Sequence, residues 1–306
     1  MQNDNLKNYL HLHFIVFVWG FTAVLGKLIS IGALPLVWFR MTIALVLMAV
    51  YAGVMKAPFR VPQKALLRMI FAGLVIALHW FTFFHAIKIS NISVTLACLS
   101  TGAFFASLLE PLLYGRKIVI YEVVFGLFVI AGLLFISGIL SFQDNAIIFQ
   151  SNINYPFGIL TALLSAFLST VFAMINGKFA KEYNATAVSF YELLGGIFFF
   201  SLYLLWDGQF TPEFFVLSNS DWLWLFVLGS ICTAYAQIAA VKVMKTITPY
   251  TMMLTINLEP IYGIILALIV FSESERMDTS FYIGAGIILI TVIINGVLKG
   301  SKGTAH

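Results

Sequence analysis

Long apolar stretches separated by short polar connections dominate the chain. A helix needs about 20 apolar residues to cross the hydrocarbon core of a bilayer, and ten stretches reach about that length. They occupy residues 10–28, 35–55, 66–87, 92–114, 118–140, 157–176, 185–206, 222–244, 249–271 and 281–298. This pattern predicts an all-α polytopic membrane protein with ten transmembrane helices.

The order of short and long connections divides the chain into two halves of five predicted helices. Sliding one half over the other places Lys88 on Lys245 and Arg40 on Glu192. Because five is odd, the second half must be inverted, and inverted repeats are typical of alternating-access transporters. We expect a first repeat in residues 1–140, an extracytoplasmic linker in 141–156, a second repeat in 157–298 and a flexible cytoplasmic tail in 299–306.

Lysines and arginines gather on one side of the predicted bundle. With the N-terminus in the cytoplasm, the opposite side receives only Lys27, Lys88 and Arg276. Basic loops stay in the cytoplasm, so both termini are expected there, and Asp144 and Glu213 are expected outside. The first run could pass for a signal peptide, but a second span follows at once, so we expect no cleavage.

Composition excludes a soluble globular protein. The chain is 61% hydrophobic and only 10% charged, whereas soluble domains average about 25% charged residues. The net charge of +4 is spread over short clusters, so no nucleic-acid surface is expected. Cys98 and Cys232 lie inside apolar runs, and we expect no disulfide, metal or cofactor.

Glu259 is the leading candidate for a functional residue. It lies near the middle of the run 249–271, directly before Pro260, and an ionisable group at that depth is a functional-site hypothesis by default. Thr251, Thr255 and Tyr262 share its helical face, and Asn257 lies two residues before it. A carboxyl there could carry a coupling proton; the alternative is a structural contact with a neighbouring helix.

His79 and Arg40 are two further candidates, and each has two possible roles. His79, beside Trp80, lies at a similar depth and titrates near neutral pH even when unperturbed; it is a second proton carrier or a packed histidine. Arg40 lies about five residues inside its span. It either clamps a carboxylate or phosphate bidentately or snorkels to the interface as an anchor.

Polar stripes on several predicted helices favour a wet cavity near the midplane. The sixth run contributes Ser169, the eighth Gln237 and the fourth Ser100. Trp19, Trp80 and Tyr235 could supply an aromatic wall. We expect the first, third, fourth, sixth, eighth and ninth helices to line this cavity.

Two glutamates and four glycines are interpreted as structural residues. Glu192 and Glu110 are interpreted as partners of Lys178 or Arg116. Four glycines in the fifth and tenth runs are predicted to let helices approach closely; they are Gly126, Gly132, Gly284 and Gly286.

The chain resembles the EamA type of the drug/metabolite transporter superfamily from about residue 10 to 298. The resemblance rests on the segment PLVWFRMTIAL with Arg40, on Pro260 followed thirteen residues later by Glu273, and on Trp19-Gly20. It implies a multi-pass protein of the cytoplasmic (inner) membrane. It also implies transport, mostly export, of amino acids or related metabolites, often with a proton.

The expected function is therefore secondary transport. The expected partners are a small-molecule substrate, the lipid bilayer and protons, and a homodimer is left open. The sequence holds no Walker loop, zinc-binding histidine pair or hydrolase elbow, so we expect no enzyme and no ATPase. Two alternatives remain: an intramembrane lipid-modifying enzyme with Glu259 and His79 as acid–base pair, and a non-transporting sensor.

Overall fold

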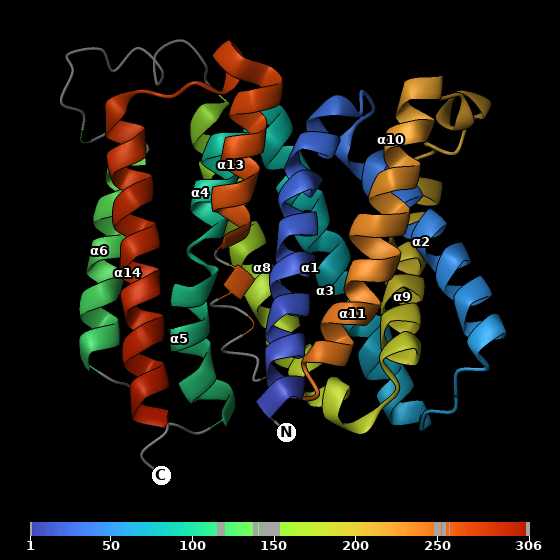
Figure 1. Cartoon of the computed structure of the whole chain (residues 1–306). Coiled ribbons are helices and arrows are strands. Elements are labelled where there is room, and N and C mark those ends of the chain that lie inside the picture. The colour runs from blue at the N-terminus through green and yellow to red at the C-terminus, as the bar shows by residue number, and fades with distance from the viewer. Residues whose placement is uncertain are drawn as a thin grey trace.

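The computed structural model describes residues 2–114, 120–136, 140, 154–247, 252, 255–256 and 258–303. Every regular element in these ranges is helical, and most helices run along one common axis (Figure 1). The first half contains α1 (Gln2–Leu28), α2 (Ala33–Met55), α3 (Gln63–Ile89), α4 (Ile92–Leu99), α5 (Gly102–Tyr114) and α6 (Ile120–Ile136).

The second half begins with two long helices, α8 (Tyr155–Glu182) and α9 (Ala185–Trp206). A short 3-10 turn, η1 (Pro212–Phe215), leads into α10 (Asn219–Gly229), the π-helix η2 (Ser230–Tyr235) and α11 (Ala236–Val243). The chain ends with α13 (Leu258–Phe271), the 3-10 turn η3 (Ser272–Glu275) and α14 (Thr279–Gly303).

Seven helical segments are long and apolar enough to cross a membrane, and three shorter apolar helices accompany them among the described residues. The chain is therefore an all-helical, multi-pass membrane protein. The number ten and the inverted arrangement remain predictions. Of the predicted segments, the linker 141–156 lies almost wholly outside the described residues, and Asp144 lies there too.

Two predicted spans are interrupted rather than continuous. The fourth changes from α4 to α5 at Ser100 and Thr101. The eighth passes from α10 through η2 into α11. In η2 the Thr233 hydroxyl donates to the Leu228 carbonyl, five residues back, at 2.7 Å, and π segments of this kind are frequent at functional sites.

The long helix α3 packs against both α8 and α9, and α1 packs against α13. Small residues allow the closest approach: a side chain at Gly73 would collide with the backbone of Glu192 on α9. Helices α6 and α14 form a pair at one side of the bundle (Figure 1), where Gly132 and Gly284 face each other's carbonyl oxygens. The predicted contact role holds for these two glycines, whereas Gly286 faces open space.

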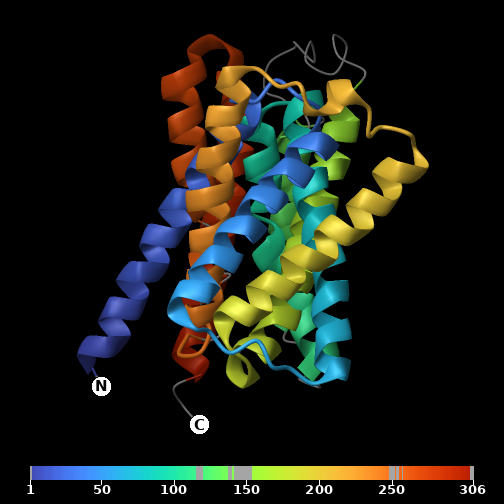
Figure 2. The same cartoon turned by 90° about the vertical axis from the view of Figure 1, so that its right-hand side faces the viewer.

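One end of the bundle, which we call the basic end, carries the chain termini and the turns that follow α2, α8 and α11 (Figures 1 and 2). Its basic residues in the described ranges are Lys7, Lys56, Arg60, Lys64, Arg68, Lys178, Lys181, Lys242, Lys245, Lys299 and Lys302. The opposite end carries Lys27, Lys88 and Arg276. The charge asymmetry predicted from the loops is therefore also present in space.

Two buried carboxylates tie the opposite end together. Glu275, in η3, accepts hydrogen bonds from the backbone N–H groups of Ile92 and Ser93 at the start of α4, at 3.1 and 2.9 Å, and pairs with Lys27 at 2.7 Å. Asp221, at the start of α10, accepts from the backbone and the hydroxyl of Ser30, both at 2.7 Å. Segments of the two halves are joined here.

Candidate functional site

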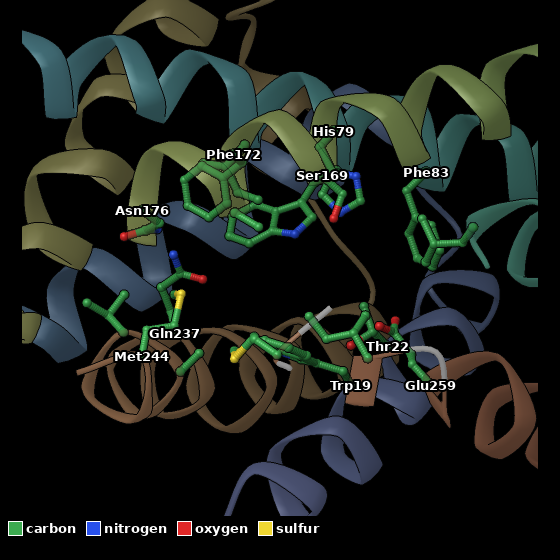
Figure 3. Close-up of a pocket in the computed structure, with 18 of the residues that line it drawn as sticks. Trp19, Thr22, His79, Phe83, Ser169, Phe172, Asn176, Gln237, Met244 and Glu259 are labelled. Carbon is green, nitrogen blue, oxygen red and sulfur yellow. The ribbon is translucent and has the colours of Figure 1, made fainter. Parts of the chain in front are cut away.

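A small cavity of about 90 Å³ lies inside the bundle (Figure 3). Helices α1, α2, α3, α4, α8, α11 and α13 contribute to its wall, so α2 joins the six helices predicted to line it. The wall is mostly apolar and aromatic, and seven lining residues besides the two tryptophans carry polar or charged groups: Thr22, Arg40, His79, Ser169, Asn176, Gln237 and Glu259.

Arg40 is buried in the interior of α2 and is 1% exposed. Its Nε donates to the Thr233 hydroxyl in η2 at 2.6 Å, and its guanidinium lies 4.0 Å from the ring centre of Trp80. Stacking on an aromatic face and bonding through Nε suit the planar guanidinium. Its Nη1 has no hydrogen-bond partner among the described residues. This burial is incompatible with snorkelling to the interface, and the clamp stays a prediction.

Glu259 lies in the first turn of α13, in the same cavity wall, and is 8% exposed. No hydrogen bond to its carboxylate is found within the described part of the chain, and no ion pair within 4.0 Å joins it to Arg40, which is also described. A buried carboxylate needs a partner or a proton. Its open position makes it available to a ligand.

His79 has a fixed tautomer. Its Nδ1 lies 2.9 Å from the backbone carbonyl of Ser165 on α8, and a carbonyl can only accept, so Nδ1 carries the hydrogen. The Ser165 hydroxyl in turn donates to the His79 carbonyl at 3.0 Å. The other ring nitrogen, Nε2, is thereby left as an acceptor on a residue that lines the cavity.

A third charged residue, Glu192 on α9, lies just behind the cavity wall and is completely buried. Its carboxylate accepts from Asn176 Nδ2 at 3.2 Å and from Gln237 Nε2 at 3.4 Å. The predicted pairing of Glu192 with Lys178 is therefore wrong, because the hydrogen-bond donors to its carboxylate are two amides that face the cavity. The Glu110 side chain and Arg116 lie outside what the structure describes.

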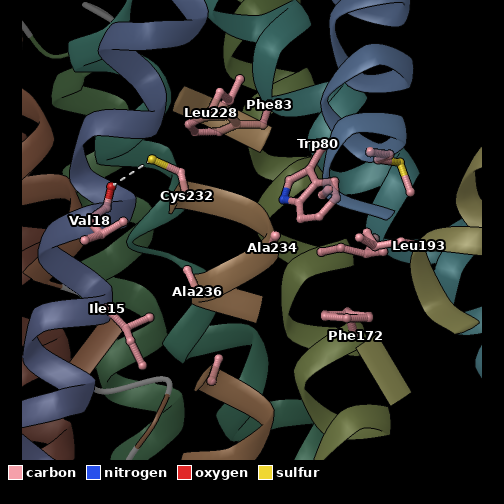
Figure 4. Close-up of a cluster of buried hydrophobic side chains, with 14 of the residues drawn as sticks. Ile15, Val18, Trp80, Phe83, Phe172, Leu193, Leu228, Cys232, Ala234 and Ala236 are labelled. Carbon is pink, nitrogen blue, oxygen red and sulfur yellow. Dashed lines mark hydrogen bonds between the residues drawn. The ribbon is translucent and has the colours of Figure 1, made fainter. Parts of the chain in front are cut away.

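Aromatic and aliphatic residues complete the wall. Trp19, Phe83 and Phe172 lie along the cavity (Figure 3), and Trp80 also lines it. Behind them the apolar core continues around Cys232, whose thiol donates to the Val18 carbonyl at 3.6 Å (Figure 4). Both cysteines are free and buried. The cavity therefore combines a rigid apolar body with a few polar groups, as small-molecule sites usually do.

Seven of the eleven predicted site residues line the cavity: Trp19, Arg40, His79, Trp80, Ser169, Gln237 and Glu259. Three lie elsewhere. Ser100 is buried at the α4–α5 break, Tyr262 packs edge-on against Phe17 at 5.5 Å, and Tyr235 faces the outside of the bundle, where it is 42% exposed. Asn257 lies outside the described residues.

Sequence reasoning placed Asn176 on the polar stripe of the sixth run without singling it out as a site residue, and it read Glu192 as structural. Asn176 follows Ser169 on the same face of α8, seven residues on, so the stripe itself was the available signal. The sequence signal for Glu192 was weaker: it aligns with Arg40 in the internal repeat. Both aligned residues are buried and bond to the eighth span, Arg40 through Thr233 and Glu192 through Gln237.

The family assignment comes from the chain as a whole. The EamA-like transporter family matches it twice, over residues 7–138 and 156–297. The chain belongs to that family. It is thus a membrane transporter of the drug/metabolite type built from two repeats, as the resemblance implied. A family of transporters also agrees with the expectation that the chain is not an enzyme.

Two other comparisons add only fold information. A solved structure titled "Crystal structure of protein" is similar to the chain with a TM-score of 0.67 over 95% of this chain and 98% of the other. At 17% sequence identity that likeness extends to the fold alone. No curated protein sequence matches the chain.

Proposed function

We propose that this transporter moves small zwitterionic metabolites, such as amino acids, through the cavity between its two halves. The observation that carries the proposal is the pair Arg40 and Glu259, two buried and opposite charges that line one cavity without bonding to each other. A carboxylate fits the open edge of Arg40. An ammonium group fits the unpaired carboxylate of Glu259, and the aromatic wall takes an apolar side chain.

The cavity has to change shape during transport. Its volume of about 90 Å³ is well below the roughly 300–1,000 Å³ of sites for drug-sized ligands. The opposite end is tied by Glu275 and Asp221, whereas the lining reaches toward the basic end through Asn176 and Met244. This arrangement supports alternating access, with the present state closed at the opposite end.

Charge indicates the orientation and the coupling residue of this proposal. The basic end faces the cytoplasm of the inner membrane by the positive-inside rule. We take the direction as export, from the basic end to the opposite end, because the resemblance to EamA-type transporters implies it. Glu259 carries the coupling proton, because protonation removes its buried charge when the substrate leaves. Cysteine labelling at Glu213 and at Lys64 checks the orientation: reagent should reach position 213 only from outside and position 64 only from inside.

The function is tested by flux in proteoliposomes. Wild-type protein should exchange radiolabelled amino acids, and accumulation should depend on a pH gradient. Glu259→Gln, which resembles the protonated form, should bind substrate more weakly because the ammonium group loses its carboxylate, keep exchange at saturating substrate, and lose gradient-driven accumulation. Arg40→Lys keeps the charge without the planar fork and should weaken substrate binding about tenfold, roughly the loss of one charge-assisted hydrogen bond.

The matched control is Glu213→Gln, because Glu213 is an exposed glutamate of the same half. It should leave both measurements unchanged. Wild-type pH dependence in Glu259→Gln would end the proton-coupling proposal, and unchanged affinity in Arg40→Lys would remove Arg40 from the binding site.

A further inference from the structure

A second hollow, separate from the cavity, opens on the side of the bundle between α1, α2, η2 and α11. We call it the lateral groove; it has a volume of about 420 Å³. Its apolar wall is formed by Leu47, Met48, Ala234, Ile238 and Ala239. Figure 2 shows the N-terminal part of α1 leaning away from the bundle on this side.

The surface around the lateral groove is apolar, as expected for a surface that contacts lipid. Beside it on α2, Val46 is 57% exposed and Val50 60%, and beside it on η2 Ile231 is 49% exposed. These apolar side chains belong to segments that cross the membrane. Water gains nothing by filling an apolar hollow at that depth, so a hydrocarbon chain is the natural occupant.

Lys242, the one charged residue that the described part of the chain contributes to the lateral groove, lies at the end of the groove that is nearer the basic end. Lys242, in the last turn of α11, has no carboxylate within ion-pair distance among the described residues, and no acidic side chain lines the groove. Two more exposed lysines lie close by, because Asn8, next to Lys7, donates to Thr246, next to Lys245, at 3.1 Å. The charge at this end of the groove is therefore positive.

Tyr51 and Tyr235 add hydrogen-bonding groups to the lateral groove. His11 Nε2 lies 2.7 Å from the Tyr235 hydroxyl and links α1 to the end of η2. The groove thus combines an apolar body with hydrogen-bonding groups and a cation, Lys242, at the end nearer the basic end. That is the polarity of an anionic phospholipid whose head lies at the basic end.

We propose that the lateral groove binds one anionic phospholipid from the leaflet at the basic end. One acyl chain lies along Leu47, Ile238 and Ala239, and the phosphate is held by Lys242 with Tyr51. The bound lipid would contact η2, whose Thr233 holds Arg40 from the other side. The lateral groove and the substrate cavity therefore share a wall.

The test uses purified full-length protein in detergent and native mass spectrometry of lipid adducts. The probes are phosphatidylglycerol and phosphatidylcholine with identical acyl chains, and glycerol phosphate as a head without a chain. Wild-type protein should bind phosphatidylglycerol at least about fivefold more tightly than phosphatidylcholine, the effect of about one lysine at an anionic surface. Glycerol phosphate should not bind measurably, because the chain supplies the apolar contact.

Two variants locate the site. Lys242→Gln should remove most of the preference for phosphatidylglycerol, whereas the matched control Lys64→Gln, an exposed lysine at the same end that does not line the groove, should keep it. Ala239→Leu fills the groove and should weaken binding of both lipids. Its melting temperature and helical circular dichroism report whether it is folded.

Several results would overturn the proposal. If wild-type protein binds the two lipids equally well, the groove does not recognise the anionic head group. If glycerol phosphate binds as tightly as the lipid, the acyl chain does not contribute to binding. Equal effects of Lys242→Gln and Lys64→Gln place the lipid elsewhere. A dimer that Ala239→Leu dissociates, without lipid adducts, would assign the lateral groove to a second copy of the chain. None of these measurements requires transport, so they stand apart from the proposed function.

Discussion

Two buried glutamates of the second half, Glu259 in α13 and Glu275 just after it, have opposite surroundings. Glu275 is fully buried and has a complete set of partners: Lys27, two backbone N–H groups and the Ser93 hydroxyl. Glu259 has no hydrogen bond within the described ranges and faces a cavity. Since an unpaired buried charge is costly, the difference separates a group that holds the protein together from one left open for a ligand or proton.

The largest loss of stability is expected from Glu275→Gln. The substitution removes the charge that pairs with Lys27 and one acceptor for the start of α4. Lys27 is 28% exposed, so water offsets part of the lost attraction, and we expect a destabilisation of about 2–3 kcal/mol. Thermal unfolding in detergent measures it. A melting temperature equal to that of the exposed control Glu213→Gln would remove the structural role of Glu275.

An intermediate loss is expected from Glu192→Gln. Both amides donate to one carboxylate oxygen, Oε2, and a glutamine with its carbonyl oxygen there stays an acceptor but loses the charge that strengthens both hydrogen bonds. Losing that charge assistance at two buried hydrogen bonds costs about 1–2 kcal/mol. The variant should also weaken substrate binding, because Asn176 and Gln237 would lose their fixed orientation at the cavity wall. Unfolding curves and substrate titrations, run side by side, check both effects. If the stability and the substrate affinity of the variant both equal those of wild type, Glu192 does not position the amides of the site.

The smallest loss of stability is expected from Glu259→Gln. No described contact is broken, and a neutral amide is easier to bury than an unpaired charge. The melting temperature should stay within the equivalent of about 1 kcal/mol of wild type or rise. A loss as large as that of Glu275→Gln would mean that Glu259 is a structural contact, and the contrast between the two glutamates would disappear.

Much of the architecture was predictable because it depends on local pattern. Hydropathy over about 20 residues is enough to recognise a membrane-crossing helix, and the distribution of lysine and arginine among short loops predicts which end faces the cytoplasm. Glu259 and Arg40 could be singled out for the same reason: each is a charge inside an apolar run. These inferences need no knowledge of which helices touch.

The partners of those charges were decided only by tertiary structure. Arg40 bonds to Thr233, 193 residues away, and Glu192 to Gln237, 45 residues away. Nothing in the neighbouring sequence marks these pairs. The sequence also left Arg40 undecided between a snorkelling anchor and a buried clamp, because both need only a long cationic side chain near a helix end.

The π-helix η2 and the contacts of Glu275 at the opposite end are the clearest features that only the tertiary structure determined. An apolar run has the same hydropathy whether its hydrogen bonds span four residues or five, so η2 was invisible until Thr233 was seen between Leu228 and Arg40. Glu275 lies in a loop where solvent exposure is the ordinary expectation. It is buried because α1 and α4 bring a lysine and free backbone N–H groups to it. Sequence therefore determined the class of the protein and its charged candidates, and helix packing determined which of them are satisfied and which remain open.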